Sequence, residues 1–229
     1  MGKNLFLIAT AAFLLNSFSV SAQSTDFSNK IRINVWAEMD ACPELAEAHN
    51  TSSGQFDYTI NRIKRTSVFL LNGMTNGWRF CYTPSDKLRN VKEEFAMEEI
   101  LPFKEDNNTI VYQKPWIQDN LVHSWVEFER TPRMKRNYTM WNTIKHKKIQ
   151  GRGYAPVKNG FEGITNAAKD ALKNAIRKHY QAIIKNKPKE IRGSVLIRNE
   201  PRLGIDAGQY MVELDFFLET DRIILYKEF

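Results

Sequence analysis

Residues 163–185 read GITNAAKDALKNAIRKHYQAIIK and form the most regular stretch of the chain. Small and branched apolar residues recur there at helical spacing, and polar residues occupy the opposite positions. Pro188 follows closely, and proline cannot continue a helix. The pattern therefore predicts a long amphipathic helix. Its apolar stripe consists of Ala167, Ala168, Ala171, Leu172, Ala175, Ile176 and Ile183, and its polar face of Lys169, Lys173, Asn174, Arg177 and Lys178.

Strands are predicted on both sides of this helix. Runs of alternating apolar residues follow it at 191–197, 209–218 and 222–226, with turns at 203–204 and 206–208. Residues 138–150 before it fit either a strand or a helix, and Gly151-Arg152-Gly153 is expected to end that segment. The order strand, helix, strand, strand predicts an antiparallel sheet with the helix packed on one face.

The first half of the chain is rich in tryptophan and phenylalanine and is predicted to be mainly antiparallel sheet. Alternation predicts strands at 31–35, 56–60, 67–71, 78–82, 109–112 and 121–128, with a hairpin turn at 72–73 or 76–77. Cys42-Pro43 begins a short expected helix, because proline suits the first helical position. Residues 91–100 are ambiguous between helix and strand.

These patterns predict an α+β fold, mainly antiparallel β, with one long amphipathic helix at about 163–185 packed on a C-terminal sheet. The chain divides into three expected parts. Residues 1–22 are a signal peptide, residues 23–132 an aromatic-rich and mainly-β part, and residues 133–229 a strand-helix-strand-strand part. The boundary is expected near Thr131-Pro132-Arg133.

The N-terminus has the pattern of a cleavable secretory signal peptide. Lys3 precedes an uncharged, mostly apolar run over 5–20, and Val20-Ser21-Ala22 provides small residues for cleavage before Gln23. A membrane anchor fits less well, because the run is shorter than the ~20 apolar residues that a bilayer core requires. No cysteine lies near the cut, which excludes lipid attachment there. We therefore expect a periplasmic or extracellular mature protein that does not span a membrane.

Cys42 and Cys81 are the only cysteines of the chain. An even number of cysteines in an exported protein predicts a disulfide, and closing a loop of this length stabilises a fold by roughly 4 kcal/mol. The alternative is two unconnected thiols. Their separation excludes a Cys-x-x-Cys redox centre.

The sequence offers no assignable catalytic, cofactor-binding or metal-binding residue. His49, His123, His146 and His179 lie far apart and show no zinc-helix spacing, and no Gly-x-Ser-x-Gly motif is present. The glycines of Gly151-Arg152-Gly153 lack the rest of a phosphate loop and fit better as places where a strand lies close to the helix. We therefore predict a protein that is not an enzyme and uses no cofactor. A carboxylate pair of an exported hydrolase stays open, because its spacing depends on the fold.

A basic segment is the one charged feature with a defined position. The chain carries a net charge of +7, and residues 130–152 contain no aspartate or glutamate. Outside the cytoplasm, such a segment would contact an acidic protein face, an anionic envelope polymer or a lipid surface, and nucleic acid is not expected as a partner. A solvated surface that keeps the protein soluble is the alternative. The candidate contact surface comprises Arg133, Lys135, Arg136, Trp141, Lys145, Lys147, Lys148 and Arg152.

The C-terminal part resembles the small domain shared by bacterial envelope lipoproteins and the flagellar T-ring assembly protein. The resemblance rests on Gly151-Arg152-Gly153-Tyr154-Ala155, the alanine-spaced helix, the strand at 191–197, Gly208 and the stretch Tyr210-Met211-Val212-Glu213-Leu214. It implies a non-enzymatic envelope domain that works in assembly around a flagellar or other surface structure, and it supplies no catalytic residue. This chain departs from the pattern in its missing lipid-attachment cysteine and its aromatic first half.

The function expected from the sequence is that of an exported, non-catalytic envelope protein with a structural, assembly or binding role. An exported hydrolase acting on envelope polymer and a small-ligand carrier that uses the aromatic first half as a pocket are the alternatives. The partner is expected to be an envelope or flagellar assembly protein, or an anionic polymer or lipid surface. The sequence does not predict an oligomeric state.

Overall fold

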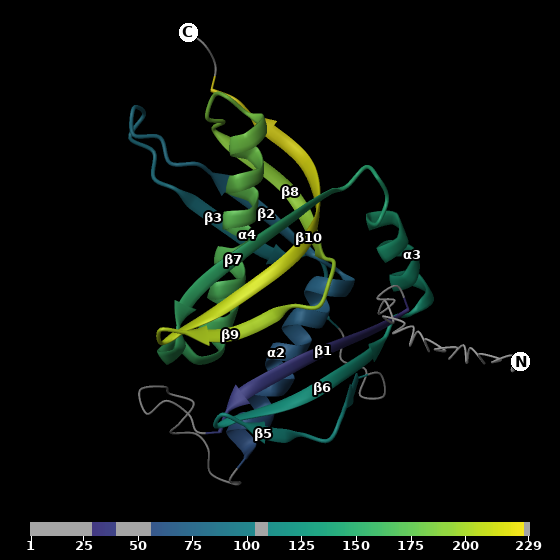
Figure 1. The fold of residues 1–229 in the computed structure, drawn as a ribbon. Helices are drawn as coiled ribbons and strands as arrows, with labels where there is room; N and C mark the ends of the chain where they lie inside the picture. The colour runs from purple at the N-terminus through teal and green to yellow at the C-terminus, as the bar shows by residue number, and fades with distance from the viewer. Residues whose placement is uncertain (1–28, 40–55, 104–109, 227–229) are drawn as a thin grey trace, which may run out of the picture.

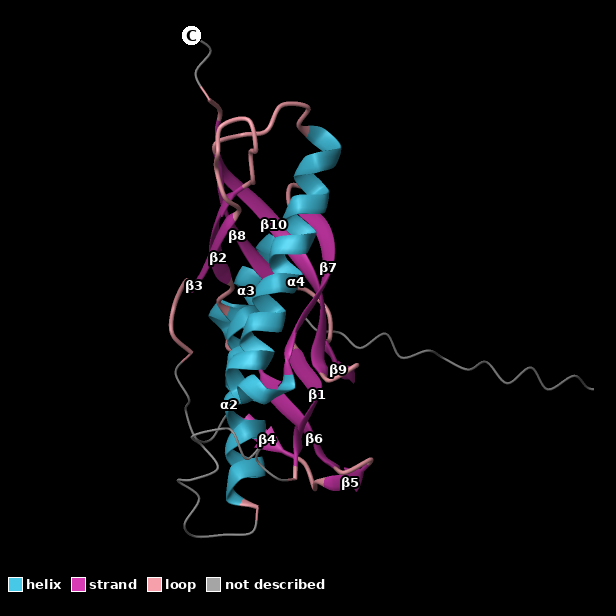
Figure 2. Cartoon of the chain, turned by 90° about the vertical axis from the view of Figure 1, so that its left-hand side faces the viewer, coloured by secondary structure: helices cyan, strands magenta, loops and turns pink. Residues whose placement is uncertain are grey.

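The computed structural model of the chain describes residues 29–39, 56–103 and 110–226 (Figure 1). They form two antiparallel sheets, and a column of helices covers one face of both, with α4 above α2 in Figure 2. The predicted α+β class is confirmed. The expected signal peptide, Cys42 and the short helix beginning there lie outside the described residues.

The elements follow one another as β1 (Lys30–Glu38), α2 (Asp57–Thr75), β2 (Trp78–Thr83), β3 (Glu94–Glu99), β4 (Ile110–Tyr112), β5 (Trp116–Gln118), β6 (Leu121–Glu129), α3 (Pro132–Trp141), β7 (Lys147–Pro156), a short 3-10 helix (Val157–Asn159), α4 (Gly160–Ile183), β8 (Glu190–Ile197), β9 (Arg202–Asp206) and β10 (Gln209–Ile224). Among the described helices, none combines the length and the apolar character needed to cross a membrane.

The six-stranded sheet has the order β3-β2-β8-β10-β7, with β9 also paired to β10. It takes strands from both sides of the boundary expected near residue 132, because β2 pairs with β8. Residues 209–218 and 222–226, expected as two strands, belong largely to the single strand β10, whose register shifts between Thr220 and Arg222. The turn expected at 203–204 was wrong, since β9 runs through it and turns at Ala207 and Gly208, both with positive φ.

The long predicted helix is confirmed as α4, which packs on β7 and β10. Gly151 and Gly153 lie inside β7 and do not end it, which corrects the expected boundary. A Cβ atom on Gly153 would collide with the backbone of α4 at Ala167, Asp170 and Ala171. The glycines therefore permit close contact between strand and helix, as the sequence indicated.

Helix α2 joins the two sheets. It contacts β1 and β6 of the four-stranded sheet and β8 of the six-stranded sheet. The four-stranded sheet has the order β1-β6-β4, with β5 also paired to β6. It confirms the strands expected at 31–35 and 121–128, and the described residues 110–112 of the strand expected at 109–112. The strands expected at 56–60 and 67–71, with a hairpin turn after them, were wrong. These residues form α2, whose buried side chains follow helical spacing, as at Thr59, Ile63 and Leu70.

Helix α3 packs on the opposite face of the six-stranded sheet. Its Tyr138 and Trp141 form a small hydrophobic cluster with Leu196 of β8 and Phe217 of β10. This arrangement resolves the ambiguous stretch 138–150, which contains the end of α3, a turn and the beginning of β7. The second ambiguous stretch, 91–100, contains strand β3.

Candidate functional site

The best-defined part of the predicted contact surface is helix α3. Thr131 caps its N-terminus, with its side-chain oxygen accepting a hydrogen bond from the Met134 amide at 3.3 Å, and Pro132 provides a first residue already restricted to helical φ. Tyr138 and Trp141 anchor one side of the helix on the sheet. Because these two residues point toward the core, Arg133 and Arg136 are left on exposed positions of the same short helix.

A groove of about 760 Å³ runs along α3 and brings three predicted contact residues together. Arg133 and Arg136 line it together with Trp141, which is itself only 5% exposed. Exposed Leu101 and Met140 add apolar surface, at 46% and 56% exposure. We call this site the α3 groove. It is lined by Thr75, Asn76, Ile100, Leu101, Pro102, Thr131, Arg133, Met134, Arg136, Asn137, Met140 and Trp141.

The α3 groove is positively charged. Among the described residues of its lining are Arg133 and Arg136 and no carboxylate. Neither arginine forms an ion pair within the part of the chain that the structure describes, whereas the adjacent Lys135 lies 3.6 Å from Glu129. An arginine that is exposed and unpaired can reach an anionic group on a partner without first breaking an internal contact.

The base of α3 is tied to the end of α2 by two polar side chains. Arg130 is buried, and its Nη1 donates to the carbonyl oxygen of Met74 at 2.6 Å, while Asn137 Nδ2 donates to the carbonyl oxygen of Thr75 at 3.0 Å. Burial lowers the pKa of Arg130 to about 10. These bonds satisfy carbonyl groups at the C-terminus of α2, where a cation also complements the helix dipole. Arg130 thus orients α3 and is not part of its contact surface.

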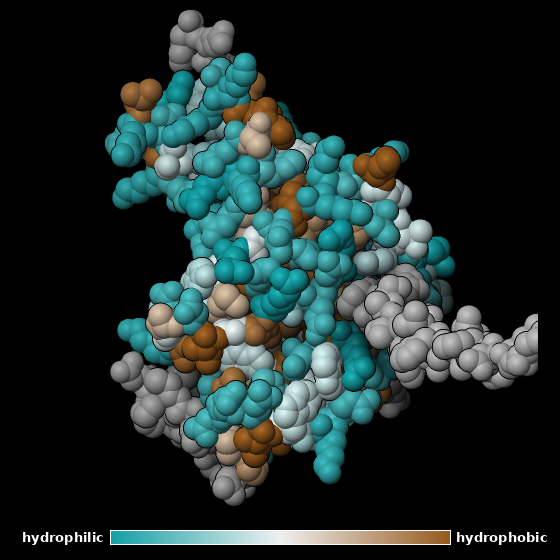
Figure 3. All heavy atoms as spheres, in the orientation of Figure 1, coloured by the Kyte–Doolittle hydropathy of each residue, from teal (hydrophilic) through white to brown (hydrophobic). Residues whose placement is uncertain are grey.

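The other predicted contact residues lie away from the α3 groove. Lys145 follows α3, and Lys147 and Lys148 are exposed on β7, which is an edge strand. Lysines on an edge strand also discourage pairing with other chains, which is the structural alternative to a binding role. In the view of Figure 3 the surface is largely hydrophilic, with hydrophobic residues in scattered patches.

Arg152 forms an ion pair with Glu213, so its guanidinium group is already occupied within the protein. Its Nε and Nη2 donate to Glu213 Oε2 at 2.9 and 2.5 Å, and Arg202 Nη1 donates to Oε1 at 2.7 Å. The hydrogen bond from Arg152 is the main reason why the pKa of Glu213 lies below its usual value. Glu213 is buried, so this arrangement stabilises β7, β9 and β10 against one another.

Cys81 lies half-buried on β2 without a disulfide to any described residue, and burial together with Glu190 raises the pKa of its thiol. Since Cys42 is outside the described residues, the Cys42–Cys81 bridge stays a prediction. Within the described ranges, no three His, Cys, Asp or Glu side chains are placed to hold a metal ion. Two histidines pack against tryptophans. The ring centroids of His123 and Trp116 are 5.3 Å apart, and those of His146 and Trp141 are 4.6 Å apart.

Sequence reasoning missed the apolar half of the α3 groove. Leu101 follows β3 and reaches α3 only through the tertiary fold, so no local pattern identifies it. Met140 could have been found, because it lies four residues after Arg136 and therefore on the same side of a helix.

The chain is similar to a curated bacterial protein and matches a protein-family model. A curated relative from Treponema pallidum (strain Nichols), described as "Uncharacterized protein", is 27% identical over 233 residues, covering 98% of this chain and 95% of the relative. No solved structure matches the chain. A protein-family model matches residues 18–226, which is most of the sequence. The chain therefore belongs to the family that this model describes.

Proposed function

We propose that this chain is an exported, non-catalytic binding protein of the cell envelope, with a structural or assembly role, and that it binds its partner through the α3 groove. The observation that carries the proposal is the position of two unpaired arginines, Arg133 and Arg136, beside the exposed apolar side chains of Leu101 and Met140. Arginine, methionine and tryptophan are enriched at protein interfaces, and all three occur here.

The partner that fits this groove is a protein segment that carries both carboxylates and apolar side chains. Carboxylates would pair with Arg133 and Arg136, and apolar side chains would cover Leu101 and Met140. An anionic polymer or a lipid headgroup layer would use the arginines and leave the apolar lining exposed to water. The signal-peptide pattern of residues 1–22 supports export, and the resemblance of the C-terminal part to an envelope domain supports an assembly role.

A crosslinking pull-down from native envelopes tests the proposal, with the tagged protein expressed in its own host. The informative variant is R133E/R136E, because it reverses the charge of the groove on exposed positions. The matched control is K178E/K185E, which makes the same change of charge at exposed lysines in and after α4 that have no ion pair among the described residues. Circular dichroism checks that both variants keep the fold.

Recovery of an envelope or flagellar assembly protein by the unchanged protein and by K178E/K185E, with loss in R133E/R136E, is the expected result. Equal recovery by all three would remove the α3 groove as the contact. A protein partner would be contradicted if the unchanged protein recovered polymer or lipid but no protein. The same amount of polymer or lipid should then be recovered by the variant M140S, which removes an apolar side chain of the groove.

The hydrolase alternative has one specific location in the described structure. A polar cleft of about 540 Å³ contains Glu200 and Asp215 near His123. Each carboxylate already has a protein partner, since Glu200 Oε1 accepts from the Asn34 amide at 3.1 Å and Asp215 Oδ2 accepts from Asn199 Nδ2 at 2.7 Å. If the purified protein hydrolysed envelope polymer and E200Q/D215N did not, the hydrolase function would be favoured over the binding function.

A further inference from the structure

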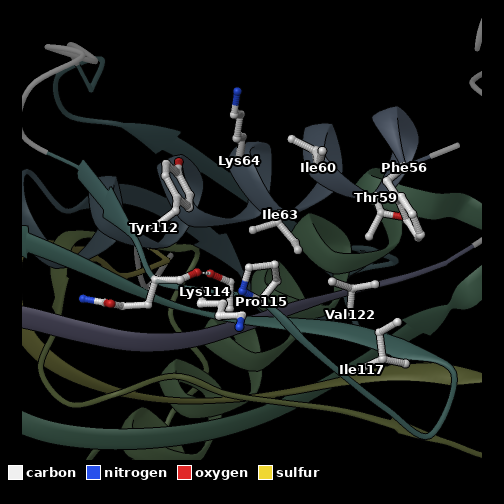
Figure 4. Close-up of a pocket in the computed structure, with 12 residues that line it drawn as sticks. Phe56, Thr59, Ile60, Ile63, Lys64, Tyr112, Lys114, Pro115, Ile117 and Val122 are labelled. Carbon is white, nitrogen blue, oxygen red and sulfur yellow. Dashed lines mark hydrogen bonds between the residues drawn. The ribbon is translucent and has the colours of Figure 1, made fainter. Parts of the chain in front are cut away.

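Another cavity, of about 490 Å³, lies between α2 and the four-stranded sheet (Figure 4). Phe56, at the start of α2, and Ile60 and Ile63 within it line one side, while Ile117 of β5 and Val122 of β6 line the other. This volume falls within the ~300–1,000 Å³ that small-molecule pockets occupy. We call the cavity the α2 pocket. It shares no lining residue with the α3 groove.

The walls of the α2 pocket are apolar, and hydroxyl groups in its lining have partners within the protein. The Thr59 hydroxyl lies 2.9 Å from the carbonyl oxygen of Glu38, and the Ser124 hydroxyl donates to the carbonyl oxygen of Gln113 at 3.0 Å. Three large apolar side chains of the lining stay exposed: Phe56 at 41%, Ile60 at 46% and Ile117 at 60%. A ligand in this pocket would therefore gain mainly from removing hydrocarbon surface from water.

The charged side chains in the lining of the α2 pocket are both lysines. Lys64 comes from α2 and Lys114 from the loop between β4 and β5, and no aspartate or glutamate is among the lining residues that the structure describes. Neither lysine has an ion pair in the described parts of the chain. Figure 4 shows Lys64 extending away from the apolar side chains, so its ammonium group lies outside the apolar lining. An anionic group is the charge that fits this arrangement.

We infer that the α2 pocket binds an amphiphile with a single hydrocarbon chain and an anionic head, a chemistry shared by fatty acids and by lysophospholipids. The hydrocarbon chain of the ligand lies against Ile60, Ile63 and Val122, and its anionic head faces Lys64 and Lys114. The inference is independent of the proposed protein contact, because a ligand in the α2 pocket leaves Arg133 and Arg136 uncovered.

The experiment is a titration of the purified full chain with cis-parinaric acid, a fatty acid whose fluorescence rises in an apolar site. Palmitate, a single-chain lysophosphatidylglycerol and hexadecanol are then compared as competitors. Palmitate and the lysolipid test the two sources of the same chemistry, and hexadecanol has the chain without the charge. Displacement by either anionic competitor at a concentration about tenfold below that of hexadecanol is the expected result, because only an anionic head can form ion pairs with the lysines of the lining.

Two variants locate the site. I60D places a carboxylate in the apolar lining at a half-exposed position and should weaken probe binding at least about tenfold, because the charge would have to be desolvated by a bound chain. I205D is its control, since Ile205 is 45% exposed on β9, outside the pocket. K64E/K114E should weaken binding of the anionic probe and leave binding of hexadecanol unchanged. K178E/K185E is the control with the same change of charge outside the pocket.

Several outcomes would overturn the inference. It fails if cis-parinaric acid does not bind the unchanged protein, or if it binds I60D and I205D equally well. Displacement by hexadecanol as effective as that by palmitate would reject the anionic head. If I60D does not fold, as judged by circular dichroism, I117D replaces it at an even more exposed position of the same lining.

Discussion

A Cβ atom on Gly151 would lie 2.9 Å from the Cβ atom of Ala175, closer than two side-chain carbons approach one another, and it would also overlap the carbonyl oxygen of Ala171. Gly153 is restricted in the same way by the backbone of α4 around Ala167. Strand β7 therefore contacts α4 through the absence of side chains. We expect G151A and G153A each to lower the free energy of unfolding by about 3 kcal/mol, because the clash is with helix backbone that cannot move aside.

Urea denaturation followed by circular dichroism measures this effect. G204A is the control, because a Cβ atom there would meet only the flexible end of Met211, at 3.1 Å. We expect G204A to change the free energy of unfolding by less than about 1 kcal/mol. Equal stability of G153A and G204A would show that β7 and α4 do not pack as closely as described.

Arg62 is a buried cation whose partners come from two other elements. Its Nη2 donates to the Tyr210 hydroxyl at 3.0 Å and lies 3.7 Å from Glu38 Oε2, while the Tyr210 hydroxyl donates to Glu38. R62M should destabilise the protein by about 3 kcal/mol, because it leaves the Glu38 carboxylate without its cation. The double variant R62M/E38Q should be more stable than R62M, since no unpaired charge is left. Thermal and urea unfolding of R62M, E38Q and the double variant measure the coupling, and strictly additive losses would contradict it.

The elements that sequence patterns predict correctly bury one regular face. In β1, Ile31, Ile33 and Val35 are fully buried and alternate with more exposed residues. The predicted apolar stripe of α4 is buried from Ala167 to Ile176, whereas its last member, Ile183, is 60% exposed at the end of the helix. Helix α2 lacks such a clean signal, because Thr59, Arg62 and Thr66 are buried among its apolar residues. The alternation of Phe56, Tyr58 and Ile60 then favours a strand, and only contacts with two sheets decide for a helix.

The predicted contact surface likewise combines residues that the sequence places correctly with residues whose positions depend on tertiary contacts. The sequence correctly predicts that Arg133 and Arg136 are exposed, because no neighbouring element of the fold buries their charged side chains. Trp141 is buried because the sheet has a second apolar face at Leu196 and Phe217, which a sequence read for one buried face does not reveal. Arg152 is engaged because β7 and β10 are adjacent in the sheet, which brings Glu213 opposite it although the two are far apart in the chain.

Two histidines should make stability depend on pH just below neutrality. Burial lowers the pKa of His123 and of His179 in the folded protein from the usual 6.5, and Lys147 lowers that of His179 further. The unfolded chain therefore binds protons first as the pH falls through 6.5, so the free energy of unfolding should decrease between pH 7 and the lower folded pKa values. H123Q/H179Q should flatten this part of the curve.

Urea denaturation at intervals of pH tests the histidine effect. The carboxylates of Glu127 and Glu213, whose folded pKa values are lowered mainly by hydrogen bonds from Lys30 and Arg152, act in a different window. Their stabilisation is present above the usual pKa of 4.5 and is lost below it. An unchanged slope between pH 7 and 5 in H123Q/H179Q would mean that other groups control stability there.

Charge reversal at two places should separate the α3 groove from the basic edge of β7. Lys147 and Lys148 pair by register with Leu218 and Phe217 of β10 and do not line the α3 groove. K147E/K148E should therefore weaken partner binding only through long-range electrostatics, by less than about threefold at physiological salt, where the Debye length is ~8 Å. R133E/R136E should weaken it by at least about tenfold, because it removes two direct contacts and introduces repulsion. Binding of the recovered partner, measured at two salt concentrations, distinguishes them. A larger loss in K147E/K148E would place the contact along β7 and reject the α3 groove.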